Sequence, residues 1–196
     1  MIDRGIARRI ARFGAGLTLF LASRAEARRE VVPPYEERLF RWANDAPDSI
    51  RAPVRTVMQA GTFGTVPIVA GVAAVAGKRR LAGSFLVGGT VAWVGAKLAK
   101  PYGGRPRPAA LLDEVTIRER IAGDLGWVSG HTAVATTLAF TAAEELPGMI
   151  SPVLAAIVAT TAFGRMYVGA HLPHDLVGGL GLGMMISSAL PGSRGA

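Results

Sequence analysis

The chain has 196 residues, of which half are hydrophobic, and its mean hydropathy of +0.34 is high for a soluble domain of this length. Its length fits one domain, and because it contains no cysteine, disulfide bonds and thiol chemistry are excluded. The net charge of +8 does not indicate a nucleic-acid-binding protein, since the basic residues cluster beside apolar segments instead of forming one basic face interleaved with aromatic residues. Such clusters are typical of anchoring to anionic lipid headgroups.

The first 58 residues are predicted to form an N-terminal segment ahead of a core at residues 59–196. Four arginines precede an apolar run at residues 13–22, which is short against the roughly 20 residues that a spanning helix needs. Three interpretations stay open: a short or tilted first span, an interfacial helix, or a signal-like segment, the last disfavoured by a charged flank without a clean cleavage site. Residues 24–58 are polar and contain several prolines, which predicts helices on the membrane interface. The apolar positions of one such helix are expected on a single face: Leu39, Phe40, Trp42 and Ala43.

Five apolar segments in the core are candidates for membrane helices. They lie at residues 61–77, 81–99, 130–143, 150–166 and 176–190 and are rich in the small residues that let helices pack closely in lipid. With the first segment counted, the chain is predicted to be an all-α, polytopic membrane helix bundle of about six spans, followed by a short tail at residues 191–196. The turn Lys78-Arg79-Arg80 is expected on the cytoplasmic side, which places the loops that begin at residues 100 and 167 on the opposite side.

Cationic side chains gather at the ends of these segments. Lys100 and Arg107 lie in the loop after the second core segment, and Arg165 lies at the end of the fourth. Arginine forks pair bidentately with phosphate oxygens and lysine adds a point charge, while Pro106 and Pro108 keep the chain around Arg107 extended. These three cations are candidates for a phosphate-binding cradle, although lysine and arginine at helix ends also reach for lipid headgroups without binding a substrate.

The tripeptide Ser129-Gly130-His131 begins the third core segment. Free N–H groups at a helix N-terminus bind anions, Gly130 lets the backbone approach a ligand, and Ser129 is suited to cap the helix or to donate to phosphate. His131 is then placed to act as a general acid. The alternative interpretation is an ordinary helix cap followed by an interfacial histidine.

His171 and Asp175 form the sharpest pair in the sequence. A histidine nucleophile needs one ring nitrogen deprotonated, and a carboxylate on the other nitrogen fixes the tautomer and stabilises the imidazolium. Pro173 suits the first turn of a helix, so His171 is expected just before that helix and Asp175 within its first turn. An aspartate so near lipid is costly without a partner. A plain helix cap is the alternative for Asp175, and His174 is expected to line the loop.

Together these residues resemble the type 2 phosphatidic acid phosphatase superfamily, whose motifs are Lys-x6-Arg-Pro, Pro-Ser-Gly-His and Ser-Arg-x5-His-x3-Asp. Lys100 and Arg107 match the first motif in full, whereas Lys97 misses its spacing. Val128 replaces the proline of the second motif, and Gly164 replaces the serine of the third. The resemblance covers about residues 60–190.

The resemblance implies a role for each matching residue. His171 would be the nucleophile that forms a phosphohistidine, Asp175 would orient it, and His131 would protonate the leaving group. Neither a metal nor another cofactor would be needed for turnover. The phosphate would be held by five further residues: Lys100, Arg107, Ser129, Gly130 and Arg165.

The sequence therefore predicts an integral-membrane phosphatase of the bacterial plasma membrane whose active site faces the extracytoplasmic side. A lipid substrate fits because the motifs lie at helix ends, with a polyprenyl pyrophosphate or a phosphorylated polyprenyl sugar favoured over phosphatidic acid and phosphatidylglycerol phosphate. The sequence leaves a homo-oligomer open. A membrane protein that binds or transports phospholipid without turnover is the second hypothesis, and a vanadate-dependent haloperoxidase is disfavoured because those enzymes are soluble and larger.

Overall fold

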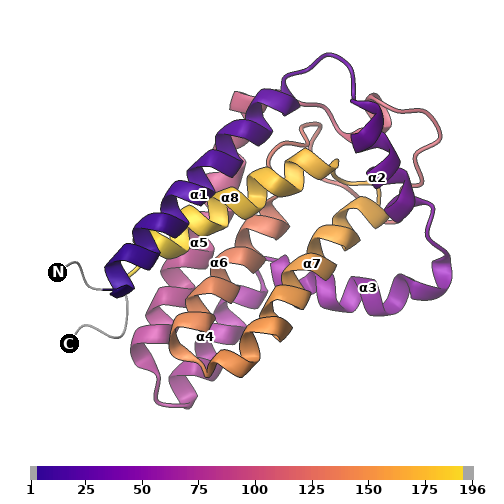
Figure 1. Ribbon diagram of the computed structural model, residues 1–196. Helices are drawn as coiled ribbons and strands as arrows, with labels where there is room; N and C mark the ends of the chain where they lie inside the picture. Colours follow the sequence, from indigo (N-terminus) through magenta and orange to yellow (C-terminus); the bar gives the residue numbers. More distant parts are fainter. Residues whose placement is uncertain (1–3, 192–196) are drawn as a thin grey trace.

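Eight α-helices build the protein in the computed structural model, which describes residues 4–191 of the chain. The predicted all-α architecture is confirmed, since the described residues contain no strand beyond an isolated bridge between Pro106 and Leu125. Of the expected C-terminal tail, only Pro191 lies among the described residues. The helices are α1 Arg4–Ala27, α2 Pro34–Asn44, α3 Arg51–Met58, α4 Thr65–Val75, α5 Arg79–Gly103, α6 Gly130–Glu145, α7 Ser151–Tyr167 and α8 Pro173–Ala189, with short 3-10 helices η1 Asp48–Ile50, η2 Gln59–Gly61, η3 Pro108–Ala110 and η4 Gly148–Ile150 (Figure 1).

The N-terminal helix α1 is longer than the apolar run at residues 13–22 alone indicates. It continues for 24 residues, about 36 Å at 1.5 Å per residue, and lies along α8 (Figure 1). A Cβ on Gly16 would lie 2.7 Å from the Gly181 carbonyl oxygen, so the two helices touch backbone to backbone there. Near the start of α1, Arg12 pairs with Glu144 at the end of α6. The basic N-terminal turn and the acidic turn after α6 therefore lie at the same end of the bundle.

Helix α2 does not present one apolar face. Phe40 and Ala43 are buried against α7 and α8, whereas Leu39 and Trp42 are 47% and 67% exposed. The prediction of a single face is wrong. Residues three apart on a helix are neighbours, so Phe40 lies beside Ala43 and Leu39 lies beside Trp42, and the two pairs lie on different sides of the helix. The exposed pair turns apolar surface outward, as a helix lying at a lipid interface does.

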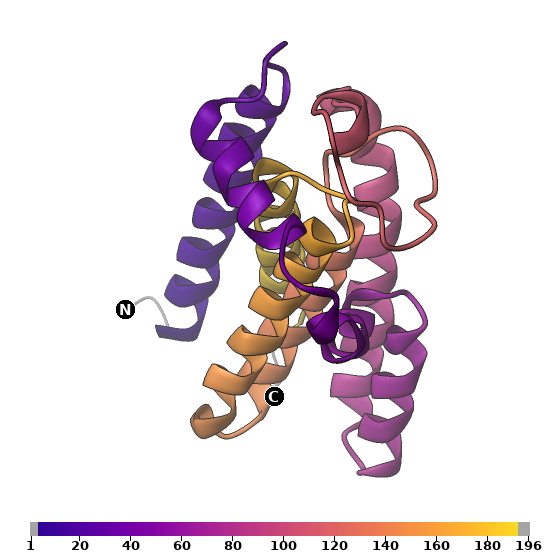
Figure 2. The same cartoon turned by 90° about the vertical axis from the view of Figure 1, so that its right-hand side faces the viewer.

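Not every helix meets the length and hydropathy of a membrane span. Among the described residues α5 and the segment Gly148–Tyr167 qualify, and a third span qualifies if Asp48–Gly61 and Thr65–Val75 count as one despite a bend of 70°. The expected span at residues 61–77 is thus replaced by a bend followed by the shorter α4. A total of about six spans therefore stays a prediction. The other helices of the bundle, α1, α6 and α8, run beside the qualifying helices (Figure 2).

Close contact between α6 and α8 brings the starts of these helices together. A Cβ on Gly179 would lie 2.6 Å from the Ser129 carbonyl oxygen, and one on Gly183 would lie 2.6 Å from Thr136 Cβ. Small residues of this kind allow helices in lipid to approach each other. At the start of α6, the Ser129 N–H donates to the Asp175 carbonyl oxygen at 2.9 Å, so the residue before α6 meets the first turn of α8 at one end of the bundle.

Candidate functional site

The ends of α5 and α7 and the start of α6 surround a cationic cavity of about 270 Å³. The structure brings six of the eight predicted site residues to the wall of this cavity, whereas Ser129 and Asp175 lie behind the wall. The six are Lys100, Arg107, Gly130, His131, Arg165 and His171. Within the described part of the chain, five lining side chains are cationic and one is a carboxylate: Lys97, Lys100, Arg107, Arg120 and Arg165, with Glu119.

Backbone carbonyl groups hold the two cations of the first motif. Lys100 Nζ donates to three carbonyl oxygens in residues 125–128, at 2.9, 3.1 and 3.4 Å. Arg107 donates to two carbonyl oxygens in residues 122–123, at 3.0 and 3.3 Å, and to that of Ala170 at 2.8 Å. Neutral acceptors satisfy the hydrogen-bonding capacity of these side chains but leave their positive charge uncompensated. Both charges are therefore available to an anion.

Arg165 contributes a third cation from the end of α7. Its guanidinium pairs with Glu119 in the loop before α6 and lies 3.7 Å from Met58 Sδ. Because the arginine is only 5% exposed, this ion pair is largely desolvated and its partners interact strongly. A phosphate that binds Arg165 would have to share the guanidinium with Glu119 or displace the carboxylate.

His171 lies between Asp175 and Arg107 in the wall of the cavity. Its Nδ1 is 3.4 Å from Asp175 Oδ2. One Arg107 guanidinium nitrogen lies 3.1 Å from Nε2 and 3.5 Å from Nδ1. Burial and then the positive charges of Arg165 and Arg107 lower the pKa of His171 well below its ordinary value, because both effects disfavour the imidazolium. A neutral ring whose Nδ1–H faces Asp175 keeps a lone pair on Nε2, which is the arrangement that a histidine nucleophile needs.

The first residues of α6 reach the cavity next to this histidine. Gly130 and His131 line it, and a Cβ on Gly61 would lie 2.4 Å from the His131 carbonyl oxygen, so η2 packs directly on the start of α6. The buried Ser129 hydroxyl accepts from Thr132 N–H and Oγ1 at 3.5 and 3.1 Å. Ser129 is thus the N-cap of α6 in the structure, and its direct contact with phosphate stays a prediction.

Asp175 is tied to two residues that sequence reasoning did not place in the site, Arg105 and Glu36. The Arg105 guanidinium lies 3.5 Å from Asp175 Oδ1. It also donates hydrogen bonds to the two Glu36 carboxylate oxygens, at 2.8 and 2.6 Å. All three side chains are at most 2% exposed. This Glu36–Arg105 clasp joins the interfacial helix α2 to the carboxylate behind His171.

The clasp keeps Glu36 ionised. Burial alone would raise the pKa of Glu36, but hydrogen bonds from Arg105 and His174 outweigh it and lower the pKa to about 2. Glu36 Oε1 accepts from the His174 N–H at 2.9 Å and lies 3.0 Å from its Nδ1. His174, which is expected from the sequence to line the loop, instead lies in the first turn of α8 and contacts the clasp.

The two positions that depart from the family motifs are packing positions. A Cβ on Gly164 would lie 3.1 Å from Met58 Sδ and 3.2 Å from Val54 Cγ1, so glycine allows α3 to approach α7 closely. Val128 is fully buried, and its carbonyl oxygen is one of those that accept from Lys100. Neither Val128 nor Gly164 lines the cavity, so neither replacement removes a side chain from its wall.

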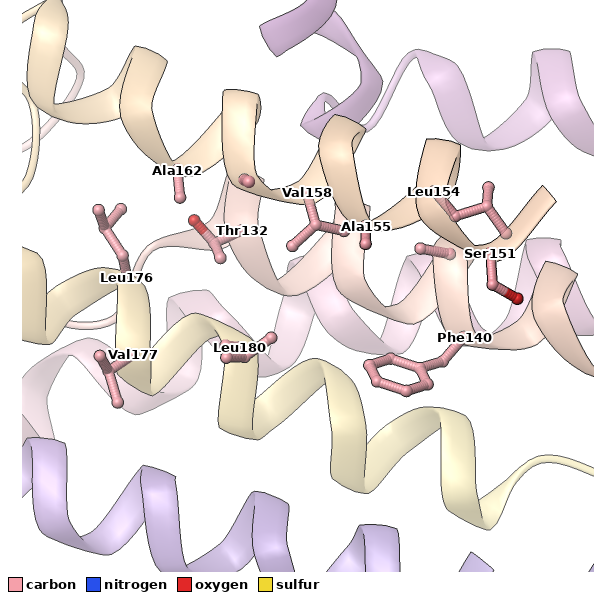
Figure 3. A pocket seen from close by; sticks show the side chains of 12 residues that line it. Thr132, Phe140, Ser151, Leu154, Ala155, Val158, Ala162, Leu176, Val177 and Leu180 are labelled. Atoms are coloured by element: carbon pink, nitrogen blue, oxygen red, sulfur yellow. The ribbon is translucent and has the colours of Figure 1, made fainter. Parts of the chain in front are cut away.

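A second, larger cavity of about 440 Å³ lies among α6, α7 and α8, and its lining is almost entirely apolar (Figure 3). Thr132 and Leu176 lie toward one end of it, and Phe140 and Ser151 lie toward the other (Figure 3). The two cavities share no lining residue among the described ones. The walls of the second cavity suit a hydrocarbon chain, whereas the cations that could bind an anion line the first cavity.

Comparison with known proteins supports the family resemblance. A family model described as PAP2 superfamily matches residues 79–193, more than half of the chain, and this range includes all eight predicted site residues. Among curated proteins, no relative matches the chain.

Two solved structures share the fold. LpxE of Aquifex aeolicus superposes with a TM-score of 0.67 and 21% sequence identity, over 76% of this chain and 90% of that one. A transmembrane PAP2 type phosphatidylglycerolphosphate phosphatase of Bacillus subtilis superposes with a TM-score of 0.70 and 18% identity, over 89% of this chain and 92% of that one. At these identities the likeness establishes a shared fold, that of a membrane helix bundle.

Proposed function

Because the chain belongs to the PAP2 superfamily, we propose that it is an integral-membrane lipid phosphatase that acts through a phosphohistidine on His171. The observation that carries this proposal is the position of His171 in a cavity lined by cations, with Asp175 beside its Nδ1 and Arg107 beside the ring, nearest to Nε2. Phosphoryl transfer needs a nucleophile, a group that orients it, and positive charge around the phosphate oxygens. These residues supply all three.

The reaction follows from this geometry in two steps. His171 Nε2 attacks phosphorus while the bond to the leaving oxygen breaks, and Asp175 accepts from Nδ1–H and stabilises the positive charge on the ring. His131 donates a proton to the leaving oxygen. In the second step water attacks the phosphorus and gives a proton to His131 while the N–P bond breaks, which releases phosphate and restores both histidines. The phosphate oxygens are held by Lys100, Arg107 and Arg165, and by Ser129 and Gly130 at the start of α6.

Turnover is proposed to need neither a metal nor another cofactor. Three motif cations around one phosphate can neutralise the charge that develops on its oxygens, which is the task that a metal ion performs in other phosphatases. Measuring activity in the presence of EDTA tests this part of the proposal separately from the role of His171.

A lipid substrate is supported by the surroundings of the cavity. The cavity lies at the ends of membrane helices, and its wall carries Phe63 and Trp93, whose ring centroids lie 4.8 Å apart. Such a wall can contact hydrocarbon next to a phosphorylated headgroup. We favour a polyprenyl pyrophosphate or a phosphorylated polyprenyl sugar, with phosphatidic acid or phosphatidylglycerol phosphate as the alternative, the latter in view of the name of the Bacillus subtilis structure.

The proposed location is the bacterial plasma membrane, with the cavity on the extracytoplasmic side. The basic turn at residues 78–80 lies at the start of α5, whereas Lys100 lies near the other end of this 25-residue helix. A basic turn favours the cytoplasmic side, so the cavity falls on the opposite side. Residues 59–196 would be the catalytic core, and residues 1–58 would support it through α1 and the Glu36–Arg105 clasp.

The deciding experiment measures phosphate release from a polyprenyl diphosphate by the detergent-purified protein with EDTA present. His171→Ala should lower turnover by at least roughly 10³-fold, whereas Arg80→Ala, an exposed cation at the far end of α5, should not change it. Release that survives in His171→Ala would contradict the proposed nucleophile. Binding of the diphosphate without release by either protein would favour a phospholipid-binding protein instead.

A further inference from the structure

Two of the five cations in the cavity lie outside the family motifs. Lys97 and Arg120 line the cavity together with the three motif cations, and Glu119 is the carboxylate among the described lining residues. Glu119 pairs with Arg165. A phosphomonoester carries at most two negative charges near neutral pH, so a single phosphate bound to the motif cations leaves Lys97 and Arg120 without an anionic partner.

Lys97 projects from the same side of α5 as Lys100, one turn earlier along the helix. Residues three apart are neighbours on a helix surface, and the step along the axis is about 4.5 Å toward the middle of the bundle. The Lys97 ammonium lies 3.5 Å from the ring centre of Trp93. A cation–π contact holds an ammonium in place without neutralising its charge, so Lys97 stays available to an anion next to the apolar part of the wall.

The loop that carries Arg120 is fixed by hydrogen bonds to two helices. Asn44 and Thr116 exchange hydrogen bonds at 2.9 and 3.0 Å, and Arg118 donates to the carbonyl oxygens of Asn44 and Tyr167 at 2.6 and 2.7 Å. These contacts place Arg120, two residues further on, at the edge of the cavity. Arg120 is exposed and makes no ion pair with any described residue.

Resting on the proposed function, we infer that Lys97 and Arg120 form a second anion subsite that binds the inner phosphate of a lipid diphosphate. The terminal phosphate occupies the motif cations beside His171. The inner phosphate, one bridging oxygen away, lies toward Lys97 and Arg120, and the first carbons of the tail contact Trp93. The substrate class is therefore a lipid diphosphate in preference to a phosphomonoester.

The subsite acts on the leaving group. His171 Nε2 forms a bond to the terminal phosphorus, and the bond from that phosphorus to the bridging oxygen breaks, with its electron pair remaining on the oxygen. The leaving group is the lipid monophosphate: His131 donates a proton to the oxygen that leaves, and Lys97 and Arg120 hold the phosphate to which that oxygen belongs. Water then hydrolyses the phosphohistidine to inorganic phosphate.

The test compares two substrates that carry the same tail, farnesyl diphosphate and farnesyl monophosphate, on the detergent-purified full chain with EDTA. The double variant Lys97→Gln with Arg120→Gln should lower kcat/KM for the diphosphate by about tenfold or more, the loss expected for charged hydrogen bonds. The loss for the monophosphate should be several-fold smaller, because its one phosphate lies on the motif cations and interacts with Lys97 and Arg120 only at longer range. Lys78→Gln with Arg80→Gln, two exposed cations before and in the first turn of α5, is the matched control and should change neither rate.

Two outcomes of this assay would overturn the inference, and a third concerns the proposed function. An equal loss on both substrates would show that Lys97 and Arg120 attract anions in general, and an unchanged rate on the diphosphate would show that they do not bind it. If the wild-type protein hydrolyses neither substrate faster than His171→Ala does, the proposed phosphatase activity itself fails, and the subsite falls with it.

A binding measurement gives a readout without turnover. In the His171→Ala background, titration calorimetry should show tighter binding of inorganic diphosphate than of inorganic phosphate. The preference should disappear when Lys97→Gln and Arg120→Gln are added. Equal affinity for the two anions in the His171→Ala protein would contradict a second subsite, whatever the activity of the wild-type enzyme.

Discussion

Replacing Glu36 by glutamine tests how much the Glu36–Arg105 clasp contributes to stability. The carboxylate accepts two hydrogen bonds from Arg105, at 2.8 and 2.6 Å, and neither side chain is more than 2% exposed. Breaking such a buried pair from one side costs roughly 3–5 kcal/mol, because the remaining charge is left uncompensated. Since Arg105 also faces Asp175, we expect the lower end, about 3 kcal/mol, which lowers the melting temperature of a chain of this size by about 10 °C.

Thermal unfolding of the detergent-purified variants measures this effect. Glu37→Gln is the matched control, because Glu37 is the next residue of α2 and its partner Arg41 forms a pair whose side chains are 35% and 33% exposed. An exposed pair of this kind contributes about 1 kcal/mol or less, so this variant should unfold close to the wild-type temperature. Equal melting temperatures for the Glu36 and Glu37 variants would refute the reasoning.

The double variant Glu36→Met with Arg105→Met separates stability from catalysis. Replacing both members of a buried ion pair by apolar residues is often close to neutral, so most of the lost stability should return. Turnover should nevertheless fall below that of the wild type, because Asp175 then lacks the guanidinium that lies 3.5 Å from its Oδ1. Recovery of turnover together with stability would show that Arg105 does not position Asp175.

The same pair predicts how stability depends on pH. Glu36 has a folded-state pKa of about 2, below its ordinary value of 4.5. The unfolded chain therefore takes up this proton first as the pH falls. The stabilisation is complete above pH 4.5 and is lost as the pH falls from 4.5 toward 2. The difference in melting temperature between wild type and Glu36→Gln should shrink over that window, and a constant difference would contradict the assignment.

Three further predictions concern the site and its side of the membrane. Asp175→Asn should lower kcat by roughly 10³-fold, because it removes the carboxylate that fixes the tautomer of the nucleophile, and a near-normal rate of phosphate release would remove that role. Arg107→Ala should weaken substrate binding about tenfold or more. It should also raise the pKa of His171, since burial and then Arg165 and Arg107 lower it, so the acid limb of the pH profile of kcat/KM should move to higher pH. Because the chain has no cysteine, single cysteines in place of Arg80 and Ala110, both exposed, should be labelled from opposite sides of the membrane, and labelling from one side would contradict the topology.

Contacts that depend on local geometry could be predicted from the sequence. His171 and Asp175 are four residues apart across the start of a helix, so their spacing alone places them within reach of each other. The order of apolar segments likewise predicts that the loops after α5 and α7 lie at one end of the bundle. The motif residues Lys100, Arg107 and Arg165 then meet because each lies at or just beyond the end of a helix.

Contacts between distant segments could not be predicted in this way. Glu36 and Arg105 are 69 residues apart, and nothing local distinguishes Glu36 from Glu37, since both lie in the first turn of α2, where acidic residues are favoured in any helix. Only the packing of α2 beside the loop after α5 decides which glutamate is buried. Lys97 was missed for another reason: it lies one turn before Lys100 but outside the spacing of the motif, so the motif alone did not assign it to the cavity wall.

Uncompensated positive charge links binding and reactivity in this site. The fold holds Lys100 and Arg107 with carbonyl oxygens, so these side chains are fixed without being neutralised. Of the five lining cations, Arg165 pairs with a carboxylate, that of Glu119. Burial and then the charges of Arg165 and Arg107 lower the pKa of His171, and we expect the cations of the cavity to attract phosphate as well. One arrangement of charge would therefore both concentrate the anion in the cavity and keep the imidazole that should attack it unprotonated.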